Sequence, residues 1–284
     1  METTKQKIIT GALVIVAVLI AFTASLWIFG AWNDEWTGFN EETKTIISDG
    51  SCNIAVVPVF GDIISYPYED RDGSGNELPP STNQDEVLDT LSKTEADPNI
   101  LGVLAIIDSS GGYPAASEAI ANGFRNSSMP VAALIRETGT SGAYLAATGA
   151  DTIIASIFSD VGSIGITMSY LENTESNLKE GFKYIPLTSA EFKDYGNPDK
   201  PLTYAERLLF ERDLKIYHDQ FVKEVAENRG LSVEQVAKLA DGSSMPGSLA
   251  LDKGLIDKIG DQETARSWFA EKLGISPDEV RFCK

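Results

Sequence analysis

The chain has 284 residues, of which 43% are hydrophobic, and it carries a formal net charge of −19 at pH 7. That length and apolar fraction are enough for a substantial buried core. The excess of Asp and Glu argues against a nucleic-acid partner, because binding to phosphates needs a basic surface. The two cysteines, Cys52 and Cys283, show no metal-site spacing, and the sequence leaves open whether they form a disulfide.

Residues 1–32 are predicted to form a membrane anchor. The segment Ile8–Gly30 contains no charged residue, and at about 1.5 Å per residue a helix of this length crosses roughly 30 Å of hydrocarbon. Lysines precede the segment and acidic residues follow it, which places the N-terminus in the cytoplasm and the rest of the chain outside the cell membrane. A cleaved signal peptide is the alternative, although its apolar core would be unusually long and no small-x-small cleavage site follows.

The remainder is predicted to be a linker followed by one domain. Residues 33–52 are polar and favour a linker, and residues 53–284 are predicted to form the domain, which begins with a buried strand at Ile54–Val59. The segment Tyr66–Gln84 is rich in Pro, Gly, Asp and Ser and has no apolar period, so a long surface loop is expected there.

Strands and helices then alternate in the pattern of an α/β fold. Each apolar run ends in small or polar residues and leads into a new element, which is typical of parallel strands whose carboxyl ends carry the functional site. The predicted elements are a strand at Ile100–Ile107, a helix at Pro114–Asn126, a strand at Val131–Arg136, a helix at Gly142–Thr148 and a strand at Thr152–Ala155.

The C-terminal part is predicted to be mainly helical. Thr203 and Glu206 have the spacing of a capping box, which predicts the start of a helix that runs to about Asn228 and stops at Gly230. A shorter helix is expected after Ser232, and turns and a short strand follow it.

A serine among small residues is the first candidate for chemistry. Ser141 lies in the sequence Gly139–Tyr144, where glycines allow a sharp turn and the close approach of a substrate carbonyl. At the start of a helix, free N–H groups and the helix dipole stabilise developing negative charge. A plain N-cap is the alternative role for this serine. The pair Gly111 and Gly112 can expose backbone amides as an oxyanion hole, or it can be a tight connection only.

Lys193 is the candidate for the base that activates Ser141. It lies between Phe192 and Tyr195, and apolar surroundings can desolvate an ammonium and favour its neutral form. A solvated loop lysine is the alternative. The only histidine, His218, falls inside the predicted long helix and is expected to be an ordinary helical residue, so a Ser-His-Asp site is not favoured.

Taken together, these segments resemble the signal peptide peptidase SppA family, the S49 serine peptidases. The resemblance covers roughly Ile54 to Asp261, and the single domain behind one anchor is similar to the short form of that family. The segments that carry it are Ile54–Val59, Asp108–Gly112, Gly139–Tyr144, Val161–Ile166, Phe192–Pro198, Asp241–Gly242 and Ala250–Asp257.

The resemblance implies a specific site. Ser141 matches the family nucleophile, Lys193 its general base, and Ser163 a serine that orients the lysine. The amides of Gly111 and Gly142 match the donors of the oxyanion hole. The resemblance implies no metal and no organic cofactor.

The resemblance also implies a fold and partners. The fold is of the ClpP/crotonase type, an α/β spiral of ββα units. The implied substrates are remnant signal peptides or other extended, largely apolar peptides near the membrane. Family members assemble into homo-oligomeric rings or domes, so whether Lys193 acts in its own subunit or in a neighbouring one stays open.

Three departures from the family pattern keep other functions in view. Ser110 stands where the family usually has Pro, Ala143 where it usually has a second Gly, and Ala190–Phe192 replaces the usual run before the lysine. Loss of proline can loosen the oxyanion turn, because proline fixes φ. One alternative is a catalytically inactive oligomeric membrane scaffold of the same fold. The other is a crotonase-like acyl-CoA enzyme, which the anchor and the acidic surface do not favour.

Overall fold

The computed structural model describes residues 47–66 and 80–283. The predicted anchor and most of the predicted linker lie outside these residues and stay predictions. No helix within the described ranges is long and apolar enough to cross a membrane. The last residues of the predicted linker lie against the domain, since Ser48 is buried and its N–H donates to Asp97 Oδ2 over 2.8 Å.

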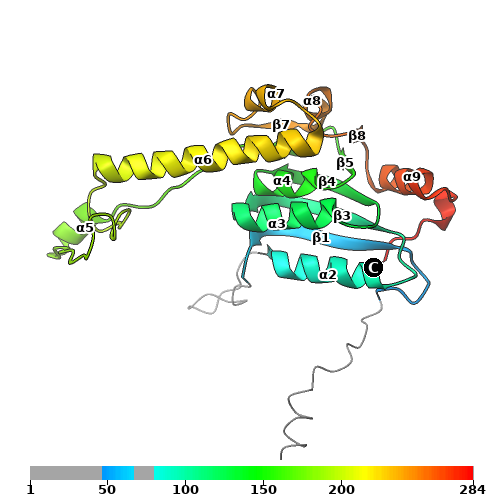
Figure 1. The fold of residues 1–284 in the computed structure, drawn as a ribbon, viewed down its shortest axis with the longest axis horizontal. Coiled ribbons are helices and arrows are strands. Elements are labelled where there is room, and N and C mark those ends of the chain that lie inside the picture. The colour runs from blue at the N-terminus through cyan, green and yellow to red at the C-terminus, as the bar shows by residue number, and fades with distance from the viewer. Residues whose placement is uncertain (1–46, 67–79, 284) are drawn as a thin grey trace, which may run out of the picture. The chain divides into compact units, whose positions relative to one another are not determined.

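Parallel strands form the centre of the domain (Figure 1). The main sheet has the strand order β2-β1-β3-β4-β5-β8, with every neighbouring pair parallel. A small extension is formed by β6, which pairs in parallel with the end of β4, and by β7, which pairs antiparallel with β6. The strands are β1 (Ile54–Ile64), β2 (Ser81–Asn83), β3 (Gly102–Gly112), β4 (Val131–Thr140), β5 (Thr152–Ala155), β6 (Asp160–Gly162), β7 (Ser244–Pro246) and β8 (Lys258–Ile259). The predicted α/β fold with parallel strands is confirmed.

Helices pack on both faces of the sheet, which explains the near-continuous apolar composition of its strands. Alternate residues of β3 point to opposite faces: Val103 packs in the larger cluster with α3 and α4, whereas Leu104 packs with Phe269 of α9. Figure 1 shows α2, α3 and α4 as one layer beside the strands, and α9 as a separate helix. The helices are α2 (Gln84–Ala96), α3 (Pro114–Arg125), α4 (Gly142–Thr148), α5 (Thr174–Lys179), α6 (Tyr204–Arg229), α7 (Val233–Ala237), α8 (Gly247–Asp252), α9 (Gln262–Leu273) and a 3-10 turn at Pro277–Glu279.

Residues 67–79 of the predicted loop Tyr66–Gln84 lie outside the described residues, and the prediction is wrong at its C-terminal end. Ser81–Asn83 forms β2 against β1, and α2 begins directly after it. The Asn83 side chain accepts a hydrogen bond from the Asp85 N–H over 2.9 Å and caps α2. The end of this polar segment therefore forms an edge strand and a helix cap, which its composition did not predict.

Two strands run further than their apolar residues predict. β3 continues past Ile107 to Gly112, and β4 continues past Arg136 to Thr140. The register between them shifts between Ile107 and Ser109, which is the mark of a bulge. Gly111 and Gly112 therefore belong to a strand, and the predicted Gly-Gly turn is replaced by backbone that β1 holds in register.

The long helix α6 has one half in the core and one half outside it. Its capping box at Thr203 and its left-handed stop at Gly230 are both present, as predicted. Its buried apolar residues, Phe221, Val222, Val225 and Ala226, all lie in the C-terminal half. We call residues 167–216, which include α5 and the N-terminal half of α6, the arm, and the other described residues the body. The arm extends beyond the layered body (Figure 1).

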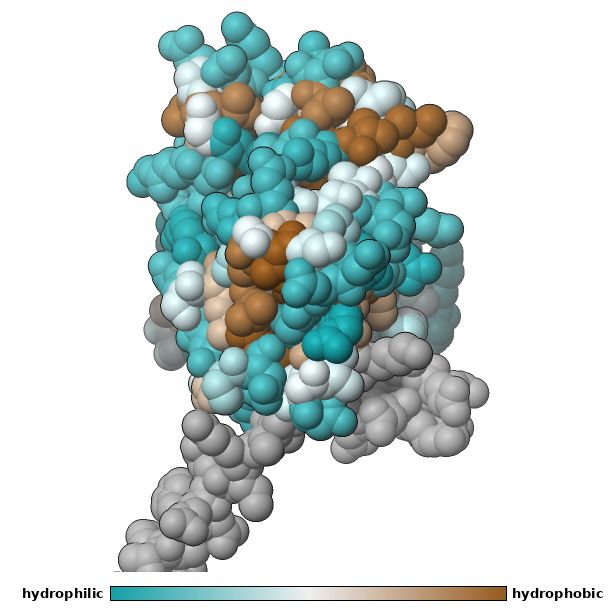
Figure 2. Space-filling view, turned by 90° about the vertical axis from the view of Figure 1, so that its right-hand side faces the viewer, coloured by the Kyte–Doolittle hydropathy of each residue, from teal (hydrophilic) through white to brown (hydrophobic). Residues whose placement is uncertain are grey.

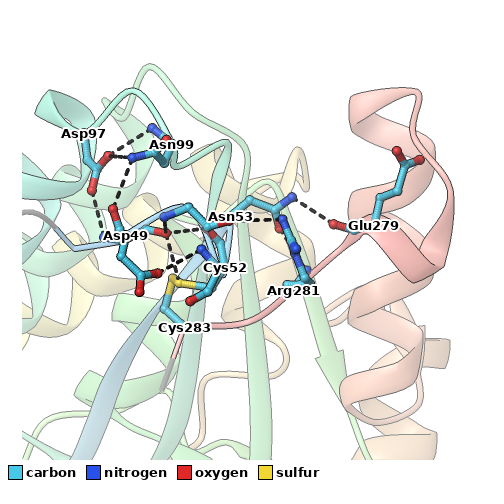
Figure 3. Close-up of a disulfide and its surroundings, with 11 residues drawn as sticks. Asp49, Cys52, Asn53, Asp97, Asn99, Glu279, Arg281 and Cys283 are labelled. Carbon is cyan, nitrogen blue, oxygen red and sulfur yellow. Dashed lines mark hydrogen bonds between the residues drawn. A yellow bond between two sulfur atoms is a disulfide. The ribbon is translucent and has the colours of Figure 1, made fainter.

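A disulfide joins the two ends of the body (Figure 3). Cys52 and Cys283 are bonded, with their Cα atoms 5.1 Å apart and a sequence separation of 231. Around them Cys283 N–H donates to Ile54 O over 2.8 Å, and the Asn53 side chain donates to Glu279 O over 2.8 Å. The pairing that the sequence left open is thus formed, and it ties the first strand to the last residues of the domain.

The surface of the body agrees with the acidic composition. Figure 2 looks at the end of the molecule that carries α9 and shows mostly hydrophilic residues, with apolar residues in separate groups. Large exposed apolar side chains are concentrated in the arm instead. They include Leu171 (85% exposed), Leu187 (95% exposed), Phe182, Ile185 and Leu178.

Candidate active site

Ser141 occupies a strained position at the junction between β4 and α4. Its φ is 53° and its ψ is −126°, a conformation that non-glycine residues seldom adopt and that is typical of functional turns. Its N–H donates to Gly162 O over 2.7 Å, and its carbonyl accepts from Leu145 N–H over 3.1 Å. The side chain makes no capping hydrogen bond. The structure therefore does not support the plain N-cap role for this hydroxyl.

The backbone around Ser141 is packed so closely that side chains are excluded. A Cβ at Gly142 would lie 2.3 Å from the buried Ser117 Oγ. A Cβ at Gly111 would lie 2.8 Å from the Gly142 nitrogen and 2.9 Å from Ser141 Cβ, and Gly111 itself has a φ of 111°. Glycine is required at both positions because of close approach. The departure at Ala143 is accommodated, since its methyl group is fully buried in the core.

The amides beside Ser141 divide into free and occupied ones. Gly142 is the first residue of α4, where the N–H has no partner within the helix. Gly111 N–H donates to Ser109 Oγ over 3.1 Å. Tyr113 N–H donates to Ile63 O over 2.8 Å.

The direction of the amides along β3 separates Gly112 from Gly111, the two glycines that the sequence offered together as a possible oxyanion hole. Alternate amides of a parallel strand face the same neighbour, so the N–H of Gly112 points away from β1. The Gly112 nitrogen lies 3.2 Å from the Cβ position of Gly142, and Gly112 lines a cavity with Ser141. The role of Gly111 stays a prediction, and the strand register favours Gly112, the other member of the predicted pair, as a candidate donor.

Ser141 lies between two cavities. One has a volume of about 350 Å³ and is enclosed by α3, α4 and α6. The other has a volume of about 300 Å³ and is lined by Ser163, Ile166, His218 and the turn at Asp241. The structure thus brings Ser141 and Ser163 to one cavity, as their predicted roles require.

Ser163 is held by the turn that precedes β7. Its φ is 51°, its N–H donates to Ser243 O over 3.0 Å, and its Oγ donates to Gly242 O over 2.9 Å. The Gly242 N–H donates in return to Ile164 O over 3.2 Å. In the same turn, hydrogen bonds from the side chain and backbone of Ser243 lower the pKa of Asp241. Two chain segments therefore fix the position of the Ser163 hydroxyl.

His218 is closer to the site than the sequence suggested. Its Nε2 lies 2.9 Å from Ala240 O, and because a carbonyl can only accept, Nε2 carries the hydrogen. The imidazole thereby joins α6 to the turn that holds Ser163, and it lines the same cavity as Ser141. Sequence position alone gave no sign of this contact.

Lys193 lies elsewhere in the subunit. It is exposed, its N–H donates to Ala190 O over 3.2 Å, and it lines neither cavity that contains Ser141. The ring of the nearby Tyr195 packs on Phe210 in the arm, with centroids 5.1 Å apart. Within one chain the structure does not bring Lys193 to Ser141, and it does not supply the apolar enclosure expected around the lysine.

Lys200, a nearby lysine of the arm, is fully engaged. Its Nζ pairs with Glu206 and lies 3.8 Å from Asp194 Oδ2. The hydrogen bond to Glu206 raises the pKa of Lys200, and the same contact lowers the pKa of Glu206. Lys200 is therefore held as an ammonium and is not a base.

A buried network fixes the helix that begins after Ser141. Tyr144 is fully buried, its hydroxyl donates to Leu255 O over 2.8 Å, and burial raises its pKa. Arg229 donates to both carboxylate oxygens of Asp257, over 2.7 and 3.0 Å. The segment Ala250–Asp257 thus supports α4 from behind. Among the described residues, no group of three or more His, Cys, Asp or Glu side chains is placed to hold a metal ion.

Comparison with known proteins gives the family. The model of peptidase family S49 matches residues 123–276. "Putative protease MJ0651" of Methanocaldococcus jannaschii is 31% identical over 221 residues, which cover 76% of this chain and 70% of that protein. "Putative signal peptide peptidase SppA" of Enterococcus faecium is 28% identical over 82% of this chain and 68% of its own length.

Two other matches are shorter or more remote. "Protease 4" of Haemophilus influenzae is 30% identical over 73% of this chain and 32% of its own length. A solved structure of a ClpP1 mutant from Listeria monocytogenes aligns with a TM-score of 0.47 and 15% identity, over 72% of this chain and 91% of that one. From the family model and the relative that is 31% identical, the chain belongs to the S49 family of serine peptidases.

Proposed function

We propose that the protein is a membrane-anchored serine endopeptidase in which Ser141 is the nucleophile and Lys193 of a neighbouring copy is the general base. The observation that carries the proposal is the setting of the Ser141 hydroxyl. This hydroxyl makes no capping hydrogen bond, and its residue lies at a strained junction. The N–H of Gly142 and the N–H of Gly112 lie beside it. A helix cap or a scaffold needs neither the strain nor the convergent amides.

The proposed reaction follows from these positions. The neutral amine of Lys193 takes the proton of Ser141 Oγ as that oxygen attacks the peptide carbonyl. The amides of Gly142 and of Gly112 or Gly111 stabilise the oxyanion, and each such donor contributes about 3–4 kcal/mol to the transition state. The ammonium then protonates the leaving amine, and water hydrolyses the acyl-enzyme.

Two observations support a second copy as the source of the lysine: Lys193 is exposed, and the cavity beside Ser141 is open. Lys193 is exposed on the arm, among apolar side chains that no described residue covers. The cavity between Ser141 and Ser163 is open, and Ser163 Oγ, which donates to Gly242 O, keeps its lone pairs for a lysine hydrogen. A homo-oligomeric ring of ClpP/crotonase-type subunits would cover the arm and bring Lys193 of one copy to Ser141 of the next.

The proposed location and substrates rest on the anchor at residues 1–32. The disulfide between Cys52 and Cys283 agrees with a domain outside the cytoplasm, because disulfides persist in oxidising compartments. Remnant signal peptides and other extended, largely apolar peptides near the membrane are the proposed substrates. An inactive scaffold and an acyl-CoA enzyme remain the competing functions.

The test is cleavage of an unfolded protein and of a fluorogenic peptide panel by three matched proteins. We expect wild type to cleave, and Ser141→Ala and Lys193→Ala to be folded by circular dichroism but inactive. Lys183→Ala, a change of another exposed lysine of the arm, is the control and stays active. Silence of a folded, assembled wild type would favour the scaffold, and thermal protection by an acyl-CoA would favour the crotonase-like enzyme.

A further inference from the structure

The cavity of about 350 Å³ beside Ser141 is mainly apolar and is also lined by two carboxylates. Its walls are mainly apolar and come from α3, α4 and α6, with Leu145 and Phe221 among them, and from Ile166 in the segment after β6. Ser141, Gly142 and Gly112 also line it, so the cavity adjoins the reacting hydroxyl and the candidate oxyanion amides. A substrate residue next to the cleaved bond has this space for its side chain.

Two carboxylates face this apolar space, and no described lysine, arginine or histidine lines it. They belong to Glu118 on α3 and Glu224 on α6. Glu118 is exposed and forms no ion pair with any described residue. Carboxylates that line an apolar cavity favour a positive charge there and disfavour a negative one.

Glu224 keeps capacity for a further partner. Its side chain is 14% exposed, its Oε1 accepts from Gln220 Nε2 over 2.7 Å, and its Oε2 lies 3.8 Å from Arg125 Nη1. The same Arg125 nitrogen donates to Asn228 Oδ1 over 2.7 Å, which is its closer contact. Because a carboxylate has about four lone-pair sites, two or more remain free for a cation.

Each carboxylate lies further along its helix than another residue that lines the cavity. In Figure 1, α3 and α4 begin at the same side of the sheet, and α6 comes from the arm and passes over α4 in the same direction. Along α3, Glu118 comes four residues after Pro114, and along α6, Glu224 comes seven residues after Tyr217, and all of these line the cavity. At about 5.4 Å per turn, the charges lie one to two turns from Pro114 and Tyr217 along their helices. A flexible four-carbon stem that carries an ammonium, or the longer arginine side chain, can span a separation of this size.

We infer that this cavity selects a lysine or arginine side chain at the residue next to the cleaved bond, with its stem against the apolar walls and its charge between Glu118 and Glu224. The inference rests on the proposed function and adds a substrate class to it. A purely apolar residue of the same length still fits the walls but leaves Glu118 without a cation and Glu224 with only its 3.8 Å contact to Arg125, and an acidic residue is rejected by like charge.

Matched peptides test the inference. One peptide sequence is made with lysine, norleucine or glutamate at the selected position, where norleucine keeps the stem of lysine and removes the charge. We expect kcat/KM for lysine to exceed that for norleucine about tenfold at low salt, with glutamate slowest, and we expect the preference to shrink as salt is added. In the double variant Glu118→Gln, Glu224→Gln the ratio of lysine to norleucine falls to about one.

The control variant is Glu234→Gln, which removes an exposed carboxylate from α7 and leaves the ratio unchanged. Cleavage of norleucine peptides as fast as, or faster than, lysine peptides by wild type would overturn the inference and leave the proposed function intact. A preference for lysine that persists in the double variant would also overturn it. Failure of wild type to cleave any peptide of the series would overturn the proposed function and the inference together.

Discussion

The body and the arm of this protein both contain large apolar side chains, but those of the body are mostly buried and those of the arm are mostly exposed. In the body, apolar side chains are buried between the sheet and its helices. The backbone at Ser141 and Gly142 is packed closely against its neighbours there. In the arm, large apolar side chains such as Leu187 are almost fully exposed, and the predicted base Lys193 is exposed with them. The comparison teaches that the surroundings of Ser141 are fixed within one chain, whereas the proposed base lies on an exposed surface.

A methyl group at Gly142 tests how rigid the complete half is. The added Cβ would lie 2.3 Å from the buried Ser117 Oγ, so we expect the amide at the start of α4 to be displaced. We predict that Gly142→Ala lowers kcat by about a hundredfold or more, as the loss of an oxyanion donor does. Steady-state kinetics on the peptide panel measure this change.

The matched change in the arm is Gly181→Ala. No atom lies within 4 Å of its Cβ position, so only the left-handed backbone, at φ 84°, opposes the substitution. We expect a local cost of about 1 kcal/mol and activity near that of wild type. Equal losses in both glycine variants would contradict the division between a rigid body and a permissive arm.

Removal of the disulfide is expected to weaken the body as a whole. The bond between Cys52 and Cys283 closes a separation of 231 residues, and the chain-entropy account gives about 5.5 kcal/mol for a loop of that size. We predict a lower midpoint of thermal unfolding for Cys52→Ser and for the reduced wild type, with unchanged kcat at temperatures where both are folded. An unchanged unfolding midpoint after reduction would show that the hydrogen bonds around Asn53 hold the ends without the disulfide.

His218 offers a smaller effect that acts through Ser163. Its Nε2–H donates to Ala240 O in the turn that also binds the Ser163 hydroxyl. We predict that His218→Ala lowers kcat about tenfold with little change in KM, because the turn loosens while the substrate cavity stays intact. His218→Gln, whose amide can donate to the same carbonyl, restores most of the activity. Equal loss in both variants would mean that the imidazole does more than hold the turn.

The ion pair of the arm gives the smallest effect and a dependence on pH. Glu206 has its pKa lowered mainly by Lys200, so its contribution is present above its ordinary pKa and is lost as pH falls through the lowered value, below about pH 4. Lys200 has its pKa raised by Glu206, so its contribution is lost only as pH rises through that raised value, above about pH 10. We predict that protection of residues 190–202 against hydrogen exchange, measured relative to the intrinsic rate at each pH, falls in acid and, at neutral pH, falls severalfold in Glu206→Gln, with β3 and β4 unchanged. Loss of protection throughout the body would contradict this local role.

The sequence predicted the elements whose signals are local. Strands with continuous apolar runs, the capping box at Thr203 and the stop at Gly230 are all present. It did not predict β2 or the extension of β3 to Gly112, because a neighbouring strand rather than apolar composition holds these polar and glycine segments.

The site, like the fold, was predicted only in part from the sequence. Ser141 and Ser163 share a cavity, as the resemblance implied, and the tight contacts at Gly142 agree with a functional turn. The side of the strand to which the Gly112 amide points depends on register, and the contact of His218 with Ala240 joins segments 22 positions apart. No local pattern encodes either feature. The distance of Lys193 from both cavities within one chain is likewise a property of the whole fold.

The most direct test of the central claim is complementation between two inactive variants. Ser141→Ala retains the lysine of the arm and Lys193→Ala retains the body with its serine, so an oligomer that contains both can assemble an intact site from neighbouring copies. If the base comes from a second copy, mixing and reassembling equal amounts restores activity to about a quarter of the wild-type level, since random neighbours form one intact pair in four. No activity in a reassembled mixture, under conditions where wild type cleaves, would contradict a site that is shared between subunits.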